Sequence, residues 1–426
     1  MKIKKNLLLG ALAALSLGSA SASVVYFTGA TSFQQSGDNA LLQYATNHYG
    51  TDVTYDNATF GKETNIIYTW GTSAGNATNL IIVHWAGSEN IIQALAQPAG
   101  LTTNAIKFNF YPTNASNGLV TTGITNSEYP QVGLYDNAQA TSFFNGYGAG
   151  DGINYGTVVN ETPFAAEGYV IIANTNWPVA GTTNATVTGG VSTNVVTYGN
   201  VTDQEFRQLF VVGTAPLSYI TGNTNDLTNS VWATGRNLDG GTRTVWFNET
   251  AFGVQNATVQ YELVQTNGSN VITPWPSATI DGVVEGYGDG GYSSDGSLRG
   301  IFTNALATGP GIDQSGSYPG LSGNNYLIGY SSIHNATGSA GVKFLTYNGV
   351  VPSSANIEIG TYSGWAKVNI GQSAIASTTN SAAIATSILT IFSGWTDSQF
   401  GAGNAALGNL QVSRDSDGGN IAPNNP

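Results

Sequence analysis

The chain has 426 residues, of which 41% are hydrophobic and only 9% are charged, with a formal net charge of −13. This length and apolar content suit two or three domains with buried cores, which excludes wholesale disorder. The acidic balance argues against a nucleic-acid binder, and the absence of cysteine excludes disulfides, thiolate metal sites and cysteine-linked lipid anchors.

The first 23 residues have the pattern of a signal peptide. A basic start, residues 1–5, precedes an apolar stretch at 7–17 and the small-residue cleavage signal at 20–22. Cleavage near Ser23 removes three lysines from a chain of net charge −13 and leaves −16. No later stretch is long and apolar enough to span a membrane. The sequence therefore predicts a periplasmic or secreted protein without membrane insertion or a lipid anchor.

A unit made of a short apolar run, a tight Gly/Ser/Thr loop and a helical pattern recurs along the chain. The strands and helices predicted in these units are residues 24–27, 34–49, 80–83, 89–96 and 231–233. Continuous apolar runs between loops indicate strands buried on both faces, hence a parallel sheet covered by helices. A capping box from Thr202 to Glu205 predicts the start of another helix. The predicted fold class is α/β.

Other segments interrupt these units. Three stretches rich in Asn, Thr and Gly, at 111–128, 178–200 and 306–325, are interpreted as surface excursions or β-hairpins. The acidic segments 289–295 and 415–418 resemble calcium loops only faintly. Because neither has the glutamate that closes such a loop, both are interpreted as solvated turns.

Common catalytic motifs are missing from the sequence. It has no His-Glu-x-x-His and no Gly-x-x-x-x-Gly-Lys motif, and His48, His84 and His334 are not spaced as metal ligands. His84 precedes Ser88 by four residues, but a strand-end histidine and a loop serine do not make an oriented nucleophile–base pair. We therefore expect no enzyme activity, no catalytic residue, no metal and no cofactor.

Small and hydroxyl residues occupy three strand–loop–helix junctions, at 29–33, 86–89 and 239–243. A helix N-terminus offers unpaired N–H groups and the positive end of the helix dipole, so such junctions attract anions. Arg236 and Arg243 flank the third junction. Ordinary helix capping by Ser and Thr is the alternative interpretation.

Six short motifs follow one another along the chain: Gly29–Phe33, Gly87-Ser88, Val132–Asp136, Arg236–Thr242, Ile328–Tyr330 and Gly360–Trp365. In sequence and in order they resemble motifs of the phosphate-binding proteins of ABC transporters, the PstS-like family. The set spans nearly the whole mature chain. The sequence departs from the family at Gly240, which replaces a serine, and at Asp239, which is shifted by one position.

The resemblance implies a two-lobed periplasmic-binding-protein fold of type II. Each lobe would be a mainly parallel sheet flanked by helices, and two crossover strands would join the lobes. After a signal peptide at 1–23, lobe 1 would comprise residues 24–172 and 360–426, and lobe 2 residues 173–359.

The resemblance also implies an exported solute-binding protein that captures phosphate or a similar oxyanion in an interlobe cleft for an ABC-transporter permease. Arg236 would supply a two-pronged donor and Asp136 would accept the ligand's proton, which sulfate lacks. The implied ligand-binding residues are Thr31, Ser32, Ser88, Asp136, Arg236, Gly240, Gly241 and Thr242.

An alternative is an extracellular structural or adhesive protein that reuses the fold without tight ligand binding. The neutral Asn/Thr/Gly-rich surface and the hydroxyl missing at Gly240 favour it. Without the resemblance, Asp136 would be interpreted as a turn former and Arg236 as part of a surface salt bridge.

Overall fold

The computed structural model describes residues 23–49, 54–55, 65–73, 76–101, 105–110, 126–146, 151–178, 199–266, 269–280, 282–303, 321–337, 339 and 341–424. The signal-peptide prediction and most of the three Asn/Thr/Gly-rich stretches lie outside these residues. Within the described part, no helix is long and apolar enough to cross a membrane.

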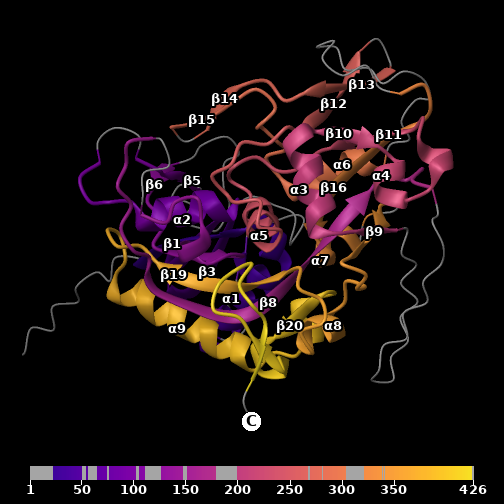
Figure 1. The fold of residues 1–426 in the computed structure, drawn as a ribbon. Helices are drawn as coiled ribbons and strands as arrows, with labels where there is room; N and C mark the ends of the chain where they lie inside the picture. Colours follow the sequence, from indigo (N-terminus) through magenta and orange to yellow (C-terminus); the bar gives the residue numbers. More distant parts are fainter. Residues whose placement is uncertain are drawn as a thin grey trace, which may run out of the picture.

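A mixed β-sheet forms the centre of the molecule, with twelve strands among the described residues (Figure 1). Its main path is β10 (Thr214–Pro216), β11 (Ser230–Ala233), β16 (Asn325–Ser332), β8 (Val159–Ala173), β19 (Trp365–Gln372), β7 (Val132–Tyr135), β1 (Ser23–Ala30), β4 (Asn76–Ala86), β3 (Asn65–Ser73) and β2 (Thr54–Tyr55). Two further strands, β17 (Lys343–Phe344) and β20 (Asn404–Ala406), pair with β8. The strands predicted at 24–27, 80–83 and 231–233 are confirmed as parts of β1, β4 and β11.

The strand directions only partly agree with the expected parallel sheet. β1 is parallel to β4 and β7, and β11 is parallel to β16. The long central strands β8 and β19 are antiparallel to each other, β8 is antiparallel to β16, and β19 is antiparallel to β7. The apolar runs correctly indicated burial on both faces, but burial does not fix direction, so the mainly parallel sheet is corrected to a mixed one.

Helices flank the sheet and connect its strands. They are α1 (Gln34–Tyr49), α2 (Ser88–Ala96), α3 (Asp203–Val212), α4 (Ser218–Thr221), α5 (Gly241–Glu249), α6 (Asp295–Phe302), α7 (Ile333–Thr337), α8 (Ser354–Glu358), α9 (Thr379–Ser393) and α10 (Asp397–Phe400). A 3-10 turn, η1 (Thr31–Phe33), joins β1 to α1. The predicted capping box is confirmed, because Thr202 Oγ1 accepts from the Glu205 N–H while the Glu205 side chain accepts from the Thr202 N–H.

Because helices flank a central sheet, the predicted α/β fold class is confirmed.

Smaller strand pairs lie outside the central sheet. They are β5 (Phe108–Phe110) with β6 (Asn126–Glu128), β9 (Asn200–Val201) with β18 (Thr346–Tyr347), β12 (Tyr261–Thr266) with β13 (Ser269–Pro274), β14 (Ala278–Ile280) with β15 (Val283–Glu285), and β21 (Val412–Ser413) with β22 (Ala422–Pro423).

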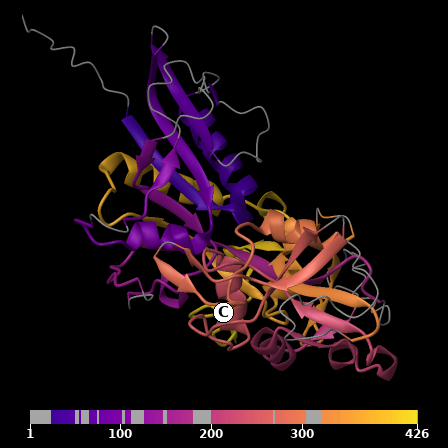
Figure 2. The same cartoon turned by 90° about the horizontal axis from the view of Figure 1, so that it is seen from above.

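The two ends of the sheet, seen from above in Figure 2, bury their side chains in different clusters. Around β1 and β4, alternate residues enter two separate cores: Val25 and Ile81 pack with α1 and α9, whereas Ile82 packs with α2. Around β16, β11 and the second half of β8, one large cluster includes Trp232, Trp246 and many other aromatic side chains. β8 contributes to both ends of the sheet and so connects them.

Candidate functional site

Asp136 is the centre of the candidate site. It follows β7 directly and is only 2% exposed. Ser32 Oγ, from the turn after β1, donates to Asp136 Oδ2 at 2.6 Å. The Asp136 N–H donates to Ser88 Oγ, at the start of α2, at 3.1 Å. Two loops that are distant in sequence therefore meet at one carboxylate.

The N-terminus of α5 packs directly against this carboxylate. A Cβ added at Gly241, the first residue of α5, would overlap Asp136 Oδ1 and lie 2.7 Å from Ser88 Cβ. Gly87 is equally confined, because a Cβ there would overlap the Asp239 carbonyl. The same carbonyl accepts from the Glu89 N–H at 3.1 Å. Only glycine at 87 and 241 allows α2 and α5 to bring their N-termini together here.

Three buried oxygens at this junction have no hydrogen-bond partner among the described residues. They are Asp136 Oδ1, Asn137 Oδ1 and Thr242 Oγ1, whose residues are 2%, 0% and 1% exposed. The cap residue of α5, Gly240, has no side chain to satisfy the first N–H groups of the helix. Buried polar atoms are normally paired, so unpaired atoms at a helix N-terminus indicate a place for a ligand.

The protonation of Asp136 depends on opposing influences. Burial raises the pKa of its carboxyl group, while the neighbouring hydroxyls of Ser32 and Ser88 and the positive charge of Arg236 lower it. The net change is upward, because desolvation is the largest of these effects. Asp136 therefore takes up a proton more readily than an ordinary aspartate.

The two arginines near α5 have different surroundings. Arg236 is 2% exposed, and its Nε and Nη2 donate to the carbonyls of Tyr292 at 2.9 Å and Ser293 at 3.0 Å. Arg243 forms an ion pair with Asp289 at 2.6 Å and lies 3.9 Å from Glu285. Arg243 is thus neutralised by carboxylates, whereas the described partners of the Arg236 side chain are carbonyls. The alternative of a surface salt bridge does not apply to Arg236.

The other predicted site residues lie close to this cluster. Gly240 packs on Arg236, since an added Cβ would be 2.8 Å from Arg236 Cβ. Thr31 and Ser32 line an adjacent hollow of about 350 Å³ together with residues of α6 and α7. The structure thus brings Ser32, Ser88, Asp136 and Gly241 into contact, with Arg236, Gly240 and Thr242 beside them and Thr31 at the edge.

Two buried glutamates next to the cluster were missed by the sequence analysis. Glu89 accepts from Asn137 Nδ2 at 2.7 Å and from Ser142 Oγ at 2.5 Å, and burial raises its pKa to about 7. Glu167 lies in β8, and burial raises its pKa well above the usual range. Tyr169 Oη donates to the Asp136 carbonyl at 3.0 Å and to Glu167 at 3.3 Å. A lone glutamate within the apolar run of β8 was the available sequence signal.

The interpretation of the two acidic segments as solvated turns is wrong for one carboxylate in each, whereas Asp415 is exposed in a bend. Asp417 is 6% exposed, and its Oδ2 accepts from the Ala138 N–H at 2.8 Å and from Thr141 Oγ1 at 2.5 Å. Asp295 is 1% exposed and accepts from Ser331 Oγ at 2.9 Å. Donors from distant parts of the chain make the burial of these carboxylates tolerable.

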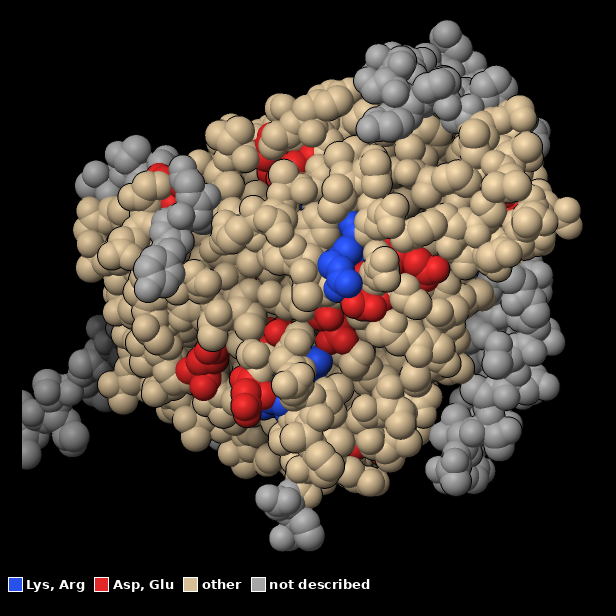
Figure 3. All heavy atoms as spheres, viewed as in Figure 1, with Lys and Arg blue, Asp and Glu red and all other residues tan. Residues whose placement is uncertain are grey.

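Charge is sparse on the surface around the site. Figure 3 shows many of the acidic and basic residues of one face in a diagonal band, with a few separate acidic residues elsewhere on a broad neutral surface. Among the described residues, no group of three or more His, Asp or Glu side chains could hold a metal ion. His84 stacks on Phe108 with ring centroids 5.2 Å apart.

Neither the protein-family models nor the curated proteins match this chain. Among solved structures, it is similar to a protein from Clostridium perfringens solved with bound phosphate, at 11% identity and a TM-score of 0.40, covering 86% of this chain and 93% of that one. It is similar to an ABC-type phosphate transport receptor from Vibrio cholerae, at 12% identity and a TM-score of 0.38, with the same coverage. It is also similar to PstS from Borrelia burgdorferi, at 12% identity and a TM-score of 0.32, covering 86% and 92%. The likeness is a coarse one of fold.

Proposed function

We propose that the protein is an exported solute-binding protein that captures phosphate or a similar tetrahedral oxyanion at Asp136 and delivers it to an ABC-transporter permease. One observation carries the proposal: the N-termini of α2 and α5 meet at a buried carboxylate whose Oδ1 has no hydrogen-bond partner. Unlike a turn former or a helix cap, that arrangement leaves buried polar atoms unsatisfied.

The groups around Asp136 suit an oxyanion. Helix N-termini supply N–H donors and partial positive charge, and the hydroxyls of Ser88 and Thr242 add further donors. Arg236 adds a full positive charge close enough to lower the pKa of Asp136. These groups can hold an anion in an acidic protein, because short hydrogen bonds outweigh a screened distant field.

Asp136 would select among oxyanions by their protons. Phosphate at neutral pH carries at least one proton, which an ionised Asp136 can accept in a hydrogen bond. Sulfate has no proton to offer, so the same carboxylate repels it. Because burial raises the pKa of Asp136, this discrimination weakens as the pH falls and the carboxyl group becomes protonated.

We further propose that the site closes between two lobes, residues 24–172 with 360–426 and residues 173–359, joined by β8 and β19. Asp136 would belong to the first lobe and Gly241 to the second. Since α5 already touches Asp136 Oδ1, an oxyanion can enter only if α5 moves away from β7. The Glu89–Asp239 hydrogen bond and the Asn335–Ser32 hydrogen bond of 3.4 Å would break in that movement.

A second candidate is an extracellular structural or adhesive protein without tight ligand binding. The observation that favours it is that the Asp136 carboxylate itself lies at the N-terminus of α5, where an anion would bind. In that case the internal carboxylate would permanently replace the ligand and fix α5 against β7.

Titration calorimetry of the mature protein after exhaustive chelation separates the two candidates. The solute-binding proposal predicts heat with phosphate and none with equimolar sulfate. Absence of heat with phosphate at any accessible concentration would overturn it and favour the structural protein. Binding that disappears with the chelator would contradict the metal-free site.

A further inference from the structure

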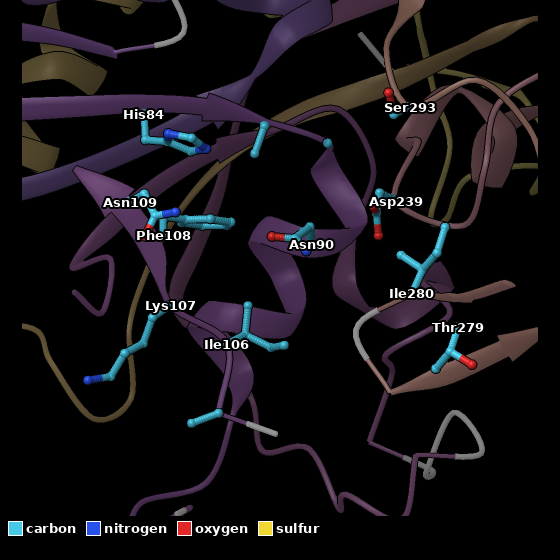
Figure 4. A pocket seen from close by; sticks show the side chains of 13 residues that line it. His84, Asn90, Ile106, Lys107, Phe108, Asn109, Asp239, Thr279, Ile280 and Ser293 are labelled. Carbon is cyan, nitrogen blue, oxygen red and sulfur yellow. The ribbon is translucent and has the colours of Figure 1, made fainter. Parts of the chain in front are cut away.

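A hollow of about 570 Å³ is lined in part by Gly87 and Asp239 (Figure 4). One wall comes from β4, α2 and the segment leading into β5, and the opposite wall comes from the Asp239 loop, β14 and Ser293. This volume is in the range of small-molecule pockets. Gly87 and the Asp239 carbonyl are in close contact at its edge, and Asp136 is not among the residues that line it.

The first wall combines an aromatic and aliphatic surface with the amide side chains of Asn90 and Asn109. His84 and Phe108 stack with an interplanar angle of 19°, and Ile106 continues the surface. Burial lowers the pKa of His84 to about 4, so the imidazole is neutral near pH 7. This side of the hollow therefore offers rings and hydrocarbon without a formal charge.

The opposite wall is polar and carries a negative charge. Asp239, whose Oδ2 accepts from Asn237 Nδ2 at 3.2 Å, points toward the hollow, as Figure 4 shows, and the hydroxyl residues Thr279 and Ser293 lie on the same side. The Lys107 ammonium points away and lies 4.5 Å from the centroid of the Tyr129 ring. The hollow therefore disfavours anions.

We propose that this hollow binds a neutral, polyhydroxylated ring of monosaccharide size. Such a ring has an apolar C–H face that packs on an aromatic wall and hydroxyls at its edge that pair with a carboxylate and with hydroxyl side chains. Charge-assisted bonds from ring hydroxyls to Asp239 would fix the orientation. This site is additional to the oxyanion site, and its two walls belong to the two proposed lobes, so it has this size in the closed arrangement that the structure shows.

The test uses the mature protein, a panel of neutral hexoses and N-acetylhexosamines, and calorimetry. Phe108→Leu removes the stacked ring but keeps most of the volume, and Asp239→Asn removes the charge without changing the shape. Phe110→Leu is the matched control, because Phe110 is buried on the same face of β5 and does not line the hollow. Circular dichroism verifies the fold of each variant.

At least one sugar should bind to the native protein. Its affinity should be lower by about tenfold or more in Phe108→Leu and in Asp239→Asn. Its affinity for Phe110→Leu should equal that for the native protein. The inference is overturned if no sugar binds at millimolar concentration, or if Phe108→Leu and Phe110→Leu bind equally well. Phosphate is titrated separately. Phosphate binding without sugar binding overturns this inference alone, and sugar binding without phosphate binding overturns only the oxyanion proposal.

Discussion

Two buried carboxylates meet at the loop after β7, and their hydrogen bonding differs. Asp136 is part of this loop, and Asp417 accepts hydrogen bonds from it. Asp417 Oδ2 accepts two hydrogen bonds, from the Ala138 N–H and Thr141 Oγ1. Asp136 Oδ2 accepts one from Ser32, and its Oδ1 has none. A carboxylate with matched donors holds segments together, whereas one with an unpaired oxygen remains able to bind a further group.

Asp417 belongs to a C-terminal clasp, residues 411–419, that holds the far end of α5. Arg414 Nη2 pairs with Glu249 at 2.8 Å, and Arg414 Nη1 donates to the carbonyls of Ser363 and Trp365. Gly418 packs closely on the Asn248 carbonyl. One end of α5 is thus fixed by paired charges, and the other end meets the half-paired Asp136.

The largest expected effect comes from breaking the clasp. Arg414→Ala leaves Glu249, whose side chain is 6% exposed, without its cation. We expect a loss of about 3–5 kcal/mol in the free energy of unfolding, measured in urea. Arg207→Ala is the control, because the Arg207–Asp203 pair is 36% and 43% exposed and should contribute about 1 kcal/mol or less. Equal losses in both variants would contradict the buried clasp.

The next prediction contrasts the two arginines beside α5. Arg236→Ala should weaken phosphate binding by about 2–5 kcal/mol, because a charged partner of the ligand is lost from a desolvated site. Arg243 is paired with Asp289, so Arg243→Ala should reduce stability more than affinity. Calorimetry and urea unfolding on both variants separate these effects. A greater loss of affinity in Arg243→Ala would show that the wrong arginine was assigned to the ligand.

Stability should fall as the pH rises above 4.5. The pKa of Glu89 is near 4.5 in the unfolded chain and about 7 in the folded protein, so the folded state holds the proton more tightly. The tighter proton binding by folded Glu89 adds about 3 kcal/mol to the free energy of unfolding. This contribution is complete below pH 4.5 and is lost as the pH rises through 7. Urea unfolding between pH 4.5 and 7.5 measures it. In Glu89→Gln the free energy of unfolding should depend less on pH. If it depends on pH as strongly as in the native protein, other carboxyl groups cause the effect.

A fourth prediction addresses selectivity at Asp136. Asp136→Asn removes a negative charge and introduces a donor, so the variant should gain sulfate binding. It should keep phosphate binding, weakened by about 1.5–3 kcal/mol, because the hydrogen bond from the ligand to a charged acceptor is lost. Competitive binding of both anions to native and variant protein is the measurement. Unaltered rejection of sulfate by a folded variant would remove Asp136 from the site.

Local sequence patterns predicted the individual elements better than their arrangement. The strand in β1, the helix α1 and the capping box of α3 depend on neighbouring residues, and they are confirmed. The antiparallel course of β8 and β19 depends on partners far away in the sequence. The motifs of the resemblance singled out Ser32, Ser88 and Asp136, which the structure places in contact.

The sequence analysis missed the buried carboxylates for one reason: the groups that pack against them or donate to them lie far away in the sequence. Asp417 is buried because its donors come from Ala138 and Thr141, more than 270 residues earlier. In the sequence, its segment has only the composition of a turn. Glu167 is buried between both ends of the sheet, and only its position inside an apolar run could have indicated this.

The smallest effect should come from the serine that donates to Asp136, and a second serine provides a direct comparison. Ser32 Oγ donates to Asp136 Oδ2, and Ser36 Oγ, one turn further along and equally buried at 4% exposure, donates to the Phe400 carbonyl. Each substitution by alanine removes one buried hydrogen bond, so each should lower the free energy of unfolding by about 1 kcal/mol. Only Ser32→Ala should also weaken phosphate binding, by a similar amount, because Ser36 is not part of the cluster. Urea unfolding and phosphate titration of both variants give the two quantities. Equal affinities in the two variants would show that the Ser32 hydroxyl only supports the fold, and the half-paired carboxylate would then be as structural as Asp417.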